Sequence, residues 1–190
     1  MREVADLSAT GDEELLSVSH LTGVTPRSEK DVNMFLAESM VGYKRCQPGD
    51  LVINTLWAWM GALGVSRCSG IISPAYGVYR TTSDAVDPHY LDYSVRTPEY
   101  VTEMTRFSKG VWTSRLRLYP ESFLALSLPV PPRDDQARIV EQVISETAEQ
   151  ERLKSTLDLF AATLAERRQA LITAAVTGQI DVTTARGVSV

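Results

Sequence analysis

The sequence predicts an α+β fold in which a globular domain is followed by one long α-helix. Three observations support this prediction. Short runs rich in β-forming residues, separated by Gly, Pro, Asn and Asp, continue to about residue 127. Two helical segments with good capping residues lie near the end of that region. From Asp134 to Val176 the chain contains no Pro and no Gly, and its apolar residues recur at helical spacing.

Length and composition are those of an ordinary globular protein. The chain has 190 residues, enough for one domain with an extension or for two small domains. It is 44% hydrophobic and carries a net charge of −5. No apolar run approaches the roughly 20 residues that a membrane helix needs, and the polar, acidic N-terminus does not read as a signal peptide. These features predict an intracellular, cytoplasmic protein.

Cysteine and histidine are too scarce and too scattered to predict a metal site. Cys46 and Cys68 lie 22 positions apart and form no Cys-x-x-Cys motif. A disulfide between them is possible on paper, but two buried, reduced thiols fit an intracellular chain better. His20 and His89 are isolated from one another and from the cysteines, whereas zinc ligands cluster.

The predicted strands lie within residues 15–21, 50–57 and 70–80. The segment PGD at 48–50 predicts a turn that feeds the second strand. Trp57 and Trp59 are two residues apart, and we expect both to pack in the core from one strand face.

The two short helices are predicted by their first residues. Asp87 or Ser83 caps the first of them. Thr97 is a good N-cap for the second, because Pro98 suits the first helical position and Glu99 adds an acid to the first turn.

A proline-rich joint, LPVPPRDDQARIV at residues 128–140, separates the two parts of the chain. Pro131 and Pro132 cannot lie inside a helix, whereas Asp134 and Asp135 suit the first turn of one. We therefore predict a globular domain over residues 1–131, a long helix over 132–178 and a tail over 179–190. The joint is expected to set the angle at which the helix leaves the domain, and Gly178 to end the helix as a C′ glycine.

The long helix carries an imperfect heptad stripe. From Leu153 to Leu164 its apolar residues are spaced four, three and four apart. Glu146 and Gln150 interrupt this seam, and Arg167 takes a later core position. We expect one partner helix plus another contacting surface, with Arg167 either extending to water at a helix crossing or pairing with an acid of the partner helix. The predicted seam residues are Ile139, Val143, Leu153, Leu157, Phe160, Leu164 and Leu171.

Three segments resemble the DNA specificity subunits of type I restriction–modification systems. The joint is similar to their junction LPxPPxxEQxxI, with Asp135 in place of the usual Glu. The segment ERRQALITAAVTGQIDV at 166–182 resembles the end of their spacer helices. The segment GDLVINTLWAWMGALGVSRCSGIISPAYGVYR at 49–80 resembles a common class of their target-recognition domain. The first 40 residues match only loosely.

The resemblance implies a non-catalytic protein that reads one half of a bipartite DNA target. It implies that modification (methyltransferase) subunits dock on the helix, that restriction subunits join them, and that S-adenosylmethionine, ATP and Mg belong to those partners, with no cofactor in this chain. A complete family member has two target-recognition domains and two long helices, so we expect a half-subunit that forms an antiparallel homodimer. The alternatives are a fragment of a longer or split subunit, and a silent cassette that pairs without reading DNA.

The residues themselves agree that catalysis is not expected here. The sequence has no glycine-rich cofactor loop after a strand, no Asn/Asp-Pro-Pro-aromatic motif, no GxxxxGK[ST] and no GxSxG. An enzyme of an unrelated class is therefore the weakest of the alternatives.

The candidate DNA contacts centre on residues 106–117, which hold four cations, two aromatic residues and no acid. Cations bind phosphates, and arginine and asparagine side chains read base edges. A solvated basic loop is the competing interpretation, with Arg115 and Arg117 as outward positions of a strand. The predicted DNA-binding residues are Arg106, Lys109, Trp112, Thr113, Ser114, Arg115 and Arg117, together with Asn54, Lys44, Arg45 and Arg67.

Overall fold

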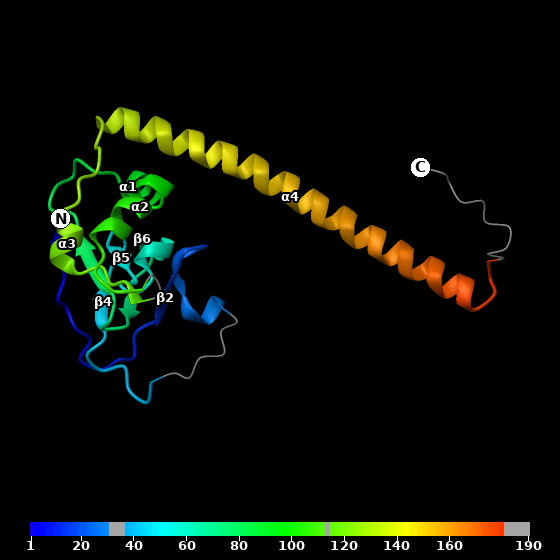
Figure 1. The fold of residues 1–190 in the computed structure, drawn as a ribbon, viewed down its shortest axis with the longest axis horizontal. Coiled ribbons are helices and arrows are strands. Elements are labelled where there is room, and N and C mark those ends of the chain that lie inside the picture. The colour runs from blue at the N-terminus through cyan, green and yellow to red at the C-terminus, as the bar shows by residue number, and fades with distance from the viewer. Residues whose placement is uncertain (31–36, 113–114, 181–190) are drawn as a thin grey trace. The chain divides into compact units, whose positions relative to one another are not determined.

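The computed structural model describes residues 1–30, 37–112 and 115–180 and confirms the predicted fold class. The chain divides into two compact units, Met1–Val140 and Glu141–Val190. The first unit combines short strands with short helices, and a long helix follows them in the chain (Figure 1). No helix within these residues is both long and apolar enough to cross a membrane.

An antiparallel four-stranded sheet in the order β1-β8-β5-β6 forms the centre of the first unit. Two smaller sheets pair β2 with β3 and β4 with β7. The strands are β1 (Arg2–Glu3), β2 (Leu16–Ser19), β3 (Gly23–Pro26), β4 (Lys44–Cys46), β5 (Leu51–Ile53), β6 (Leu63–Val65), β7 (Gly70–Ile72) and β8 (Gly77–Arg80).

The inner part of the central sheet is buried on both faces, because β5, β6 and the first three residues of β8 carry no charged side chain, whereas β1 at the edge is polar and exposed. Successive strand residues point to opposite faces, so Leu51 and Ile53 of β5 enter one core cluster and Val52 enters the other. The first cluster also holds apolar residues of the helices, and the second holds residues of β2, β3, β4 and β7. The helices and the smaller sheets therefore cover opposite faces of the sheet.

The two predicted short helices of the first unit begin directly after the predicted capping residues Asp87 and Thr97. Asp87 Oδ1 accepts hydrogen bonds from the backbone N–H groups of His89 and Tyr90, at 2.9 and 3.1 Å. Thr97 Oγ1 accepts one from Tyr100 N–H, at 3.4 Å. The helices are α1 (Pro88–Val95), α2 (Pro98–Phe107) and α3 (Pro120–Leu124), with single 3₁₀ turns η1 (Arg27–Glu29) and η2 (Ala58–Met60).

The expectation that Trp57 packs in the core was wrong. The strand ends at Ile53, because Asn54 Oδ1 accepts the Leu56 N–H at 3.2 Å and starts a turn. Trp57 then precedes η2 and is 51% exposed, while Trp59 is half-buried. Residues two apart point to the same face only in an extended strand. Because this segment is a turn, the spacing of Trp57 and Trp59 does not place both side chains in the core.

Both cysteines are free, as the sequence favoured, and Cys46 is buried while Cys68 is half-buried. Burial raises the pKa of the Cys46 thiol to about 11, because the thiolate would lose its hydration.

The helix α4 (Arg133–Val176) has 44 residues and spans about 66 Å. It ends at a Schellman motif, in which Gly178 adopts a φ of 74° and Gln179 N–H donates to Ala174 O at 2.8 Å. The predicted stop at Gly178 is thus confirmed, whereas residues 181–190 of the predicted tail lie outside the described residues.

A buried ion pair ties β8 to the turn before β5. The Asp50 side chain is 1% exposed and accepts two hydrogen bonds from Arg80, both at 2.7 Å. Asp50 Oδ2 also accepts the Gln47 N–H at 2.9 Å, so this carboxylate shapes the predicted PGD turn.

Replacing Arg80 with alanine should lower the free energy of unfolding by about 2 kcal/mol, because it leaves the Asp50 carboxylate buried and unpaired. Urea denaturation measures the change. Arg2→Ala is the matched control, because Arg2 faces Arg80 across the β1–β8 ladder and is exposed. Equal stability of the two variants would contradict a structural role for the pair.

Candidate nucleic-acid interface

The basic loop, defined as residues 106–117, is closed at its base by backbone hydrogen bonds. Lys109 N–H donates to Arg117 O, and Arg117 N–H donates to Lys109 O, each at 2.9 Å. Nearer the tip, Arg115 N–H donates to Trp112 O at 2.8 Å. A Cβ atom at Gly110 would lie 2.6 Å from Arg115 O, so this close approach requires glycine.

The end of the basic loop is anchored in the core. Leu118 is 1% exposed, and its N–H donates to Thr55 O at 3.0 Å. The next residue, Tyr119, makes cation–π contacts with two cations. Lys109 Nζ lies 5.8 Å from the ring centroid and Arg117 Cζ lies 5.7 Å from it. Such cation–π contacts hold both charges beside the loop while leaving them in reach of solvent.

The remaining predicted residues of the basic loop are solvent-facing or lie outside the described part of the chain. Arg106 pairs with Glu103 at 3.0 Å, and its side chain stays 72% exposed. Arg115 is exposed, and Trp112 is 70% exposed. Thr113 and Ser114 fall among the residues that the structure does not describe. The described part of the loop thus presents cations, which a duplex-binding surface requires for phosphate contact, and an exposed aromatic side chain beside them.

The predicted contacts outside the loop have partners within the fold or lie on other elements. Lys44 Nζ donates to Tyr76 O at 2.8 Å and contacts Glu3 at 3.5 Å. Arg45 pairs with Glu13 at 2.9 Å. Their position on β4 does not bring them into the hairpin-like base of the basic loop. Their DNA contacts stay predictions.

Hydrogen bonds to the Glu13 carboxylate favour its charged form. The Ser8 hydroxyl, which donates at 2.5 Å, makes the largest contribution to lowering the pKa of Glu13, and Arg45 adds to it. The positive charge of Arg45 is therefore balanced by the ionised carboxylate of Glu13.

Asn54 is 8% exposed, and its Oδ1 is used in the turn before η2. Thr55, which follows it, accepts the bond from Leu118 that anchors the basic loop. This placement favours a supporting role for Asn54 behind the loop. Arg67 is exposed on the connection between β6 and β7. Among residues 1–30, 37–112 and 115–180, no three His, Cys, Asp or Glu side chains could together hold a metal ion.

Sequence reasoning missed the role of Gln136, although this residue lies in the proline-rich joint. It is fully buried in the first turn of α4. Its Oε1 accepts the Asp87 N–H at 2.7 Å, and its Nε2 donates to Ala85 O and Pro131 O at 2.8 and 2.7 Å. One amide thus satisfies three backbone groups, from the segment before α1 and from the joint itself.

Two further contacts hold the same joint. Tyr90 of α1 donates its hydroxyl hydrogen to Pro129 O at 2.9 Å. Arg133 lies 3.6 Å from the Asp87 carboxylate. The N-cap residue of α1 therefore also contacts the start of α4.

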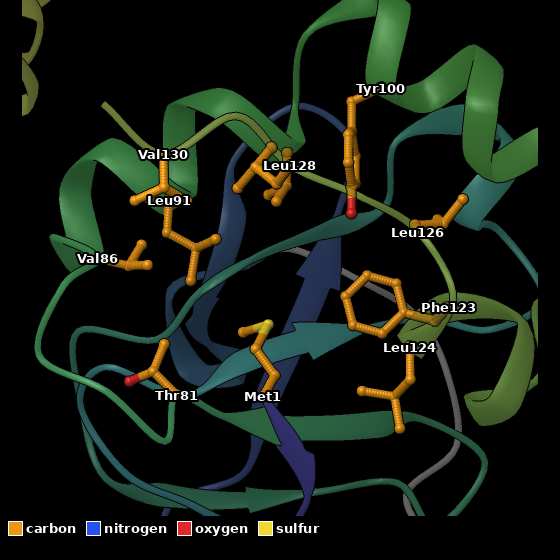
Figure 2. Close-up of a pocket in the computed structure, with 11 residues that line it drawn as sticks. Met1, Thr81, Val86, Leu91, Tyr100, Phe123, Leu124, Leu126, Leu128 and Val130 are labelled. Atoms are coloured by element: carbon orange, nitrogen blue, oxygen red, sulfur yellow. The ribbon is translucent and has the colours of Figure 1, made fainter. Parts of the chain in front are cut away.

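The first residues of the joint and the chain just before it line an apolar cavity of about 290 Å³ (Figure 2). Leu126, Leu128 and Val130 alternate along this segment and line the cavity together with Leu91 and Tyr100. No charged side chain lines it, so the cavity seats the joint and does not resemble a site for a nucleic acid or an ion.

The predicted seam of α4 is open to solvent. Six of its seven residues expose between 42% and 61% of their surface, and Val143 is half-buried. A helix with apolar residues at this spacing is stable in water when another surface covers them.

Two solved structures have a similar fold. The HsdS subunit from Thermoanaerobacter tengcongensis aligns with a TM-score of 0.58 and 17% identity, over 92% of this chain and 45% of that chain. A chain from a study of complex assembly and conformational transition of the type I R-M system aligns with a TM-score of 0.54 and 22% identity, over 72% of this chain and 32% of that chain. The chain therefore spans less than half the length of either protein. No protein-family model and no curated protein sequence matches it.

Proposed function

We propose that the chain is a DNA sequence-specificity subunit of a type I restriction–modification enzyme and reads one half of a bipartite target per copy. The observation that carries this proposal is the HsdS-like fold, which is shared over 92% of the chain and so includes both the globular part and the long helix. In this role the chain is non-catalytic. It determines which DNA sequence is bound, and partner subunits catalyse the reactions.

In the proposed complex, the basic loop contacts the DNA duplex. Lys109 and Arg117 bind phosphates. Arg115 is exposed, and Arg106 stays largely exposed in its pair with Glu103, so both can reach phosphates or guanine edges. The anchored base supports this role, because residues that are held in place before binding lose less conformational entropy on binding.

The exposed seam of α4 supports pairing with a second helix. We propose that this helix comes from a second copy of the chain and runs antiparallel to the first. Two copies related by a two-fold axis would then read inverted half-sites at a fixed separation. Methyltransferase subunits dock on the paired helices and restriction subunits join them. S-adenosylmethionine, ATP and Mg are bound by those partners.

Charge reversal at Arg167 should weaken the proposed dimer about tenfold, because antiparallel pairing brings this residue near Glu146 or Glu149 of the partner. Sedimentation equilibrium of the Arg167→Glu variant measures the dissociation constant. Adding Glu149→Arg to the same chain should restore part of the affinity.

Arg152→Glu is the matched control, since it makes the same charge change on the helix face away from the seam. An Arg167→Glu dimer as tight as the Arg152→Glu dimer would rule out the pairing.

A gel-shift titration tests the proposed function. The full chain with methyltransferase subunits should retard duplexes that contain the target at moderate salt and discriminate against scrambled duplexes. The chain alone should bind weakly and only at low salt, because its net charge is −5. A complex that assembles but never discriminates between sequences would favour the silent pairing protein instead.

A further inference from the structure

Two large apolar side chains stand exposed at the tip of the basic loop. Val111 is 91% exposed and Trp112 is 70% exposed. They are adjacent in the chain, whereas single exposed apolar residues scattered over a surface need no explanation. Cations flank them on both sides, at Lys109 and Arg115. This arrangement complements DNA, because the cations match its phosphates and the apolar side chains match its stacked bases.

The base below this tip is well held. Two backbone hydrogen bonds join Lys109 to Arg117, and the ring of Tyr119 lies under both of their charges. Buried Leu118 fixes the base to the core. The apolar pair therefore projects from an anchored platform, and its insertion into a partner would require little rearrangement of the loop base.

We propose that Val111 and Trp112 form an apolar wedge that enters a groove of duplex DNA and partly unstacks one base step. Lys109 and Arg117 would hold the phosphates beside the wedge. This inference rests on the proposed function and names the way in which the same loop contacts its DNA. Apolar side chains inserted between base steps kink a duplex, and the sequence dependence of that kink is itself a form of target recognition.

The wedge and the phosphate contacts differ in their response to salt. Phosphate contacts release counterions, so losing one should lower the slope of log K against log salt by about 0.9. An apolar contact releases none. Trp112→Ala should therefore weaken binding about tenfold with an unchanged slope, whereas Lys109→Ala should weaken binding and flatten the slope.

The experiment uses the full chain with its methyltransferase subunits and a target duplex selected from a random pool by the wild-type complex. 2-Aminopurine is placed at successive positions of one half-site, because its fluorescence rises when it unstacks. The wild-type complex should raise the fluorescence at one step, and Trp112→Ala should abolish that rise. Trp57→Ala is the matched control, since Trp57 is 51% exposed outside the basic loop.

The outcomes separate this inference from the proposed function. If the wild-type complex selects no sequence from the pool, the proposed function fails. If it selects a sequence, but Trp112→Ala retains both the affinity and the fluorescence rise, the wedge alone is overturned. If Trp112→Ala instead loses its methyltransferase subunits in size-exclusion chromatography, the tip is a protein contact, and the wedge is likewise overturned.

Discussion

Replacing Gln136 with leucine is expected to lower the free energy of unfolding of the globular unit by about 3 kcal/mol. Leucine has a similar size but leaves the Asp87 N–H, the Ala85 carbonyl and the Pro131 carbonyl without their buried partner. Each unsatisfied buried group costs about 1–3 kcal/mol, and relaxation of the joint toward water recovers part of the sum. Urea denaturation should show a lower midpoint with an unchanged slope.

The Gln136→Glu variant tests the two hydrogen bonds that Gln136 Nε2 donates, through the pH dependence of stability. A carboxylate still accepts from Asp87 but faces two carbonyl oxygens to which it cannot donate. Burial and these carbonyls should raise the folded-state pKa of the new carboxyl group above its unfolded value of about 4.3. The loss of stability, relative to wild type at the same pH, is then full at neutral pH and shrinks as the pH falls toward about 4.

Gln142→Leu is the control for both variants, because Gln142 is exposed on α4 and its side chain donates to exposed Glu146. It should change stability by less than about 0.5 kcal/mol. If Gln136→Leu behaves like Gln142→Leu, the joint does not depend on this amide.

In the proposed homodimer, lengthening α4 by one heptad should lengthen the gap between the two proposed half-sites. Duplication of Leu157–Thr163 keeps the seam in phase and adds about 10.5 Å to each helix. At about 3.4 Å per base pair along DNA, the gap should grow by about three base pairs. The bases read in each half-site should not change, because the globular unit is untouched. Sequencing of methylated sites made by the reconstituted complex measures both quantities.

Inserting five residues at the same place is the matched control. It rotates the seam by about 140°, so it should abolish pairing and with it bipartite recognition. An unchanged gap after the heptad duplication would contradict the idea that the length of α4 sets the distance between the half-sites.

Local signals in the sequence predicted the elements that depend on local chemistry. Thr97 and Asp87 began their helices as expected, because a side-chain cap acts on the next two or three residues. Gly178 ended α4 for a similar reason, since its φ of 74° suits glycine. The strands β1, β3, β4 and β6 were not predicted, because their segments lie outside the runs rich in β-forming residues and they depend on their pairing partners more than on their own propensity.

The candidate site was predictable as a charge pattern but not as a geometry. Four cations without an acid are visible in the sequence. The contact of Lys109 and Arg117 with Tyr119 is not, because it depends on the antiparallel closure of the loop. Gln136 carried no clear local signal, because it follows Asp134 and Asp135 and precedes Arg138 in a charged segment. Its three partners lie up to 51 positions away in the chain, beyond the reach of pattern analysis.

Sequencing of methylated DNA from the organism that carries the gene, before and after removal of the gene, tests whether this chain sets the DNA sequence specificity of a methyltransferase. We expect a bipartite motif with inverted half-sites and a fixed gap, methylated in the presence of the gene and unmethylated after its removal. Complementation with the Lys109→Ala, Arg117→Ala double variant should restore that methylation poorly. A methylation pattern that is identical with and without the gene would contradict a role in DNA sequence specificity.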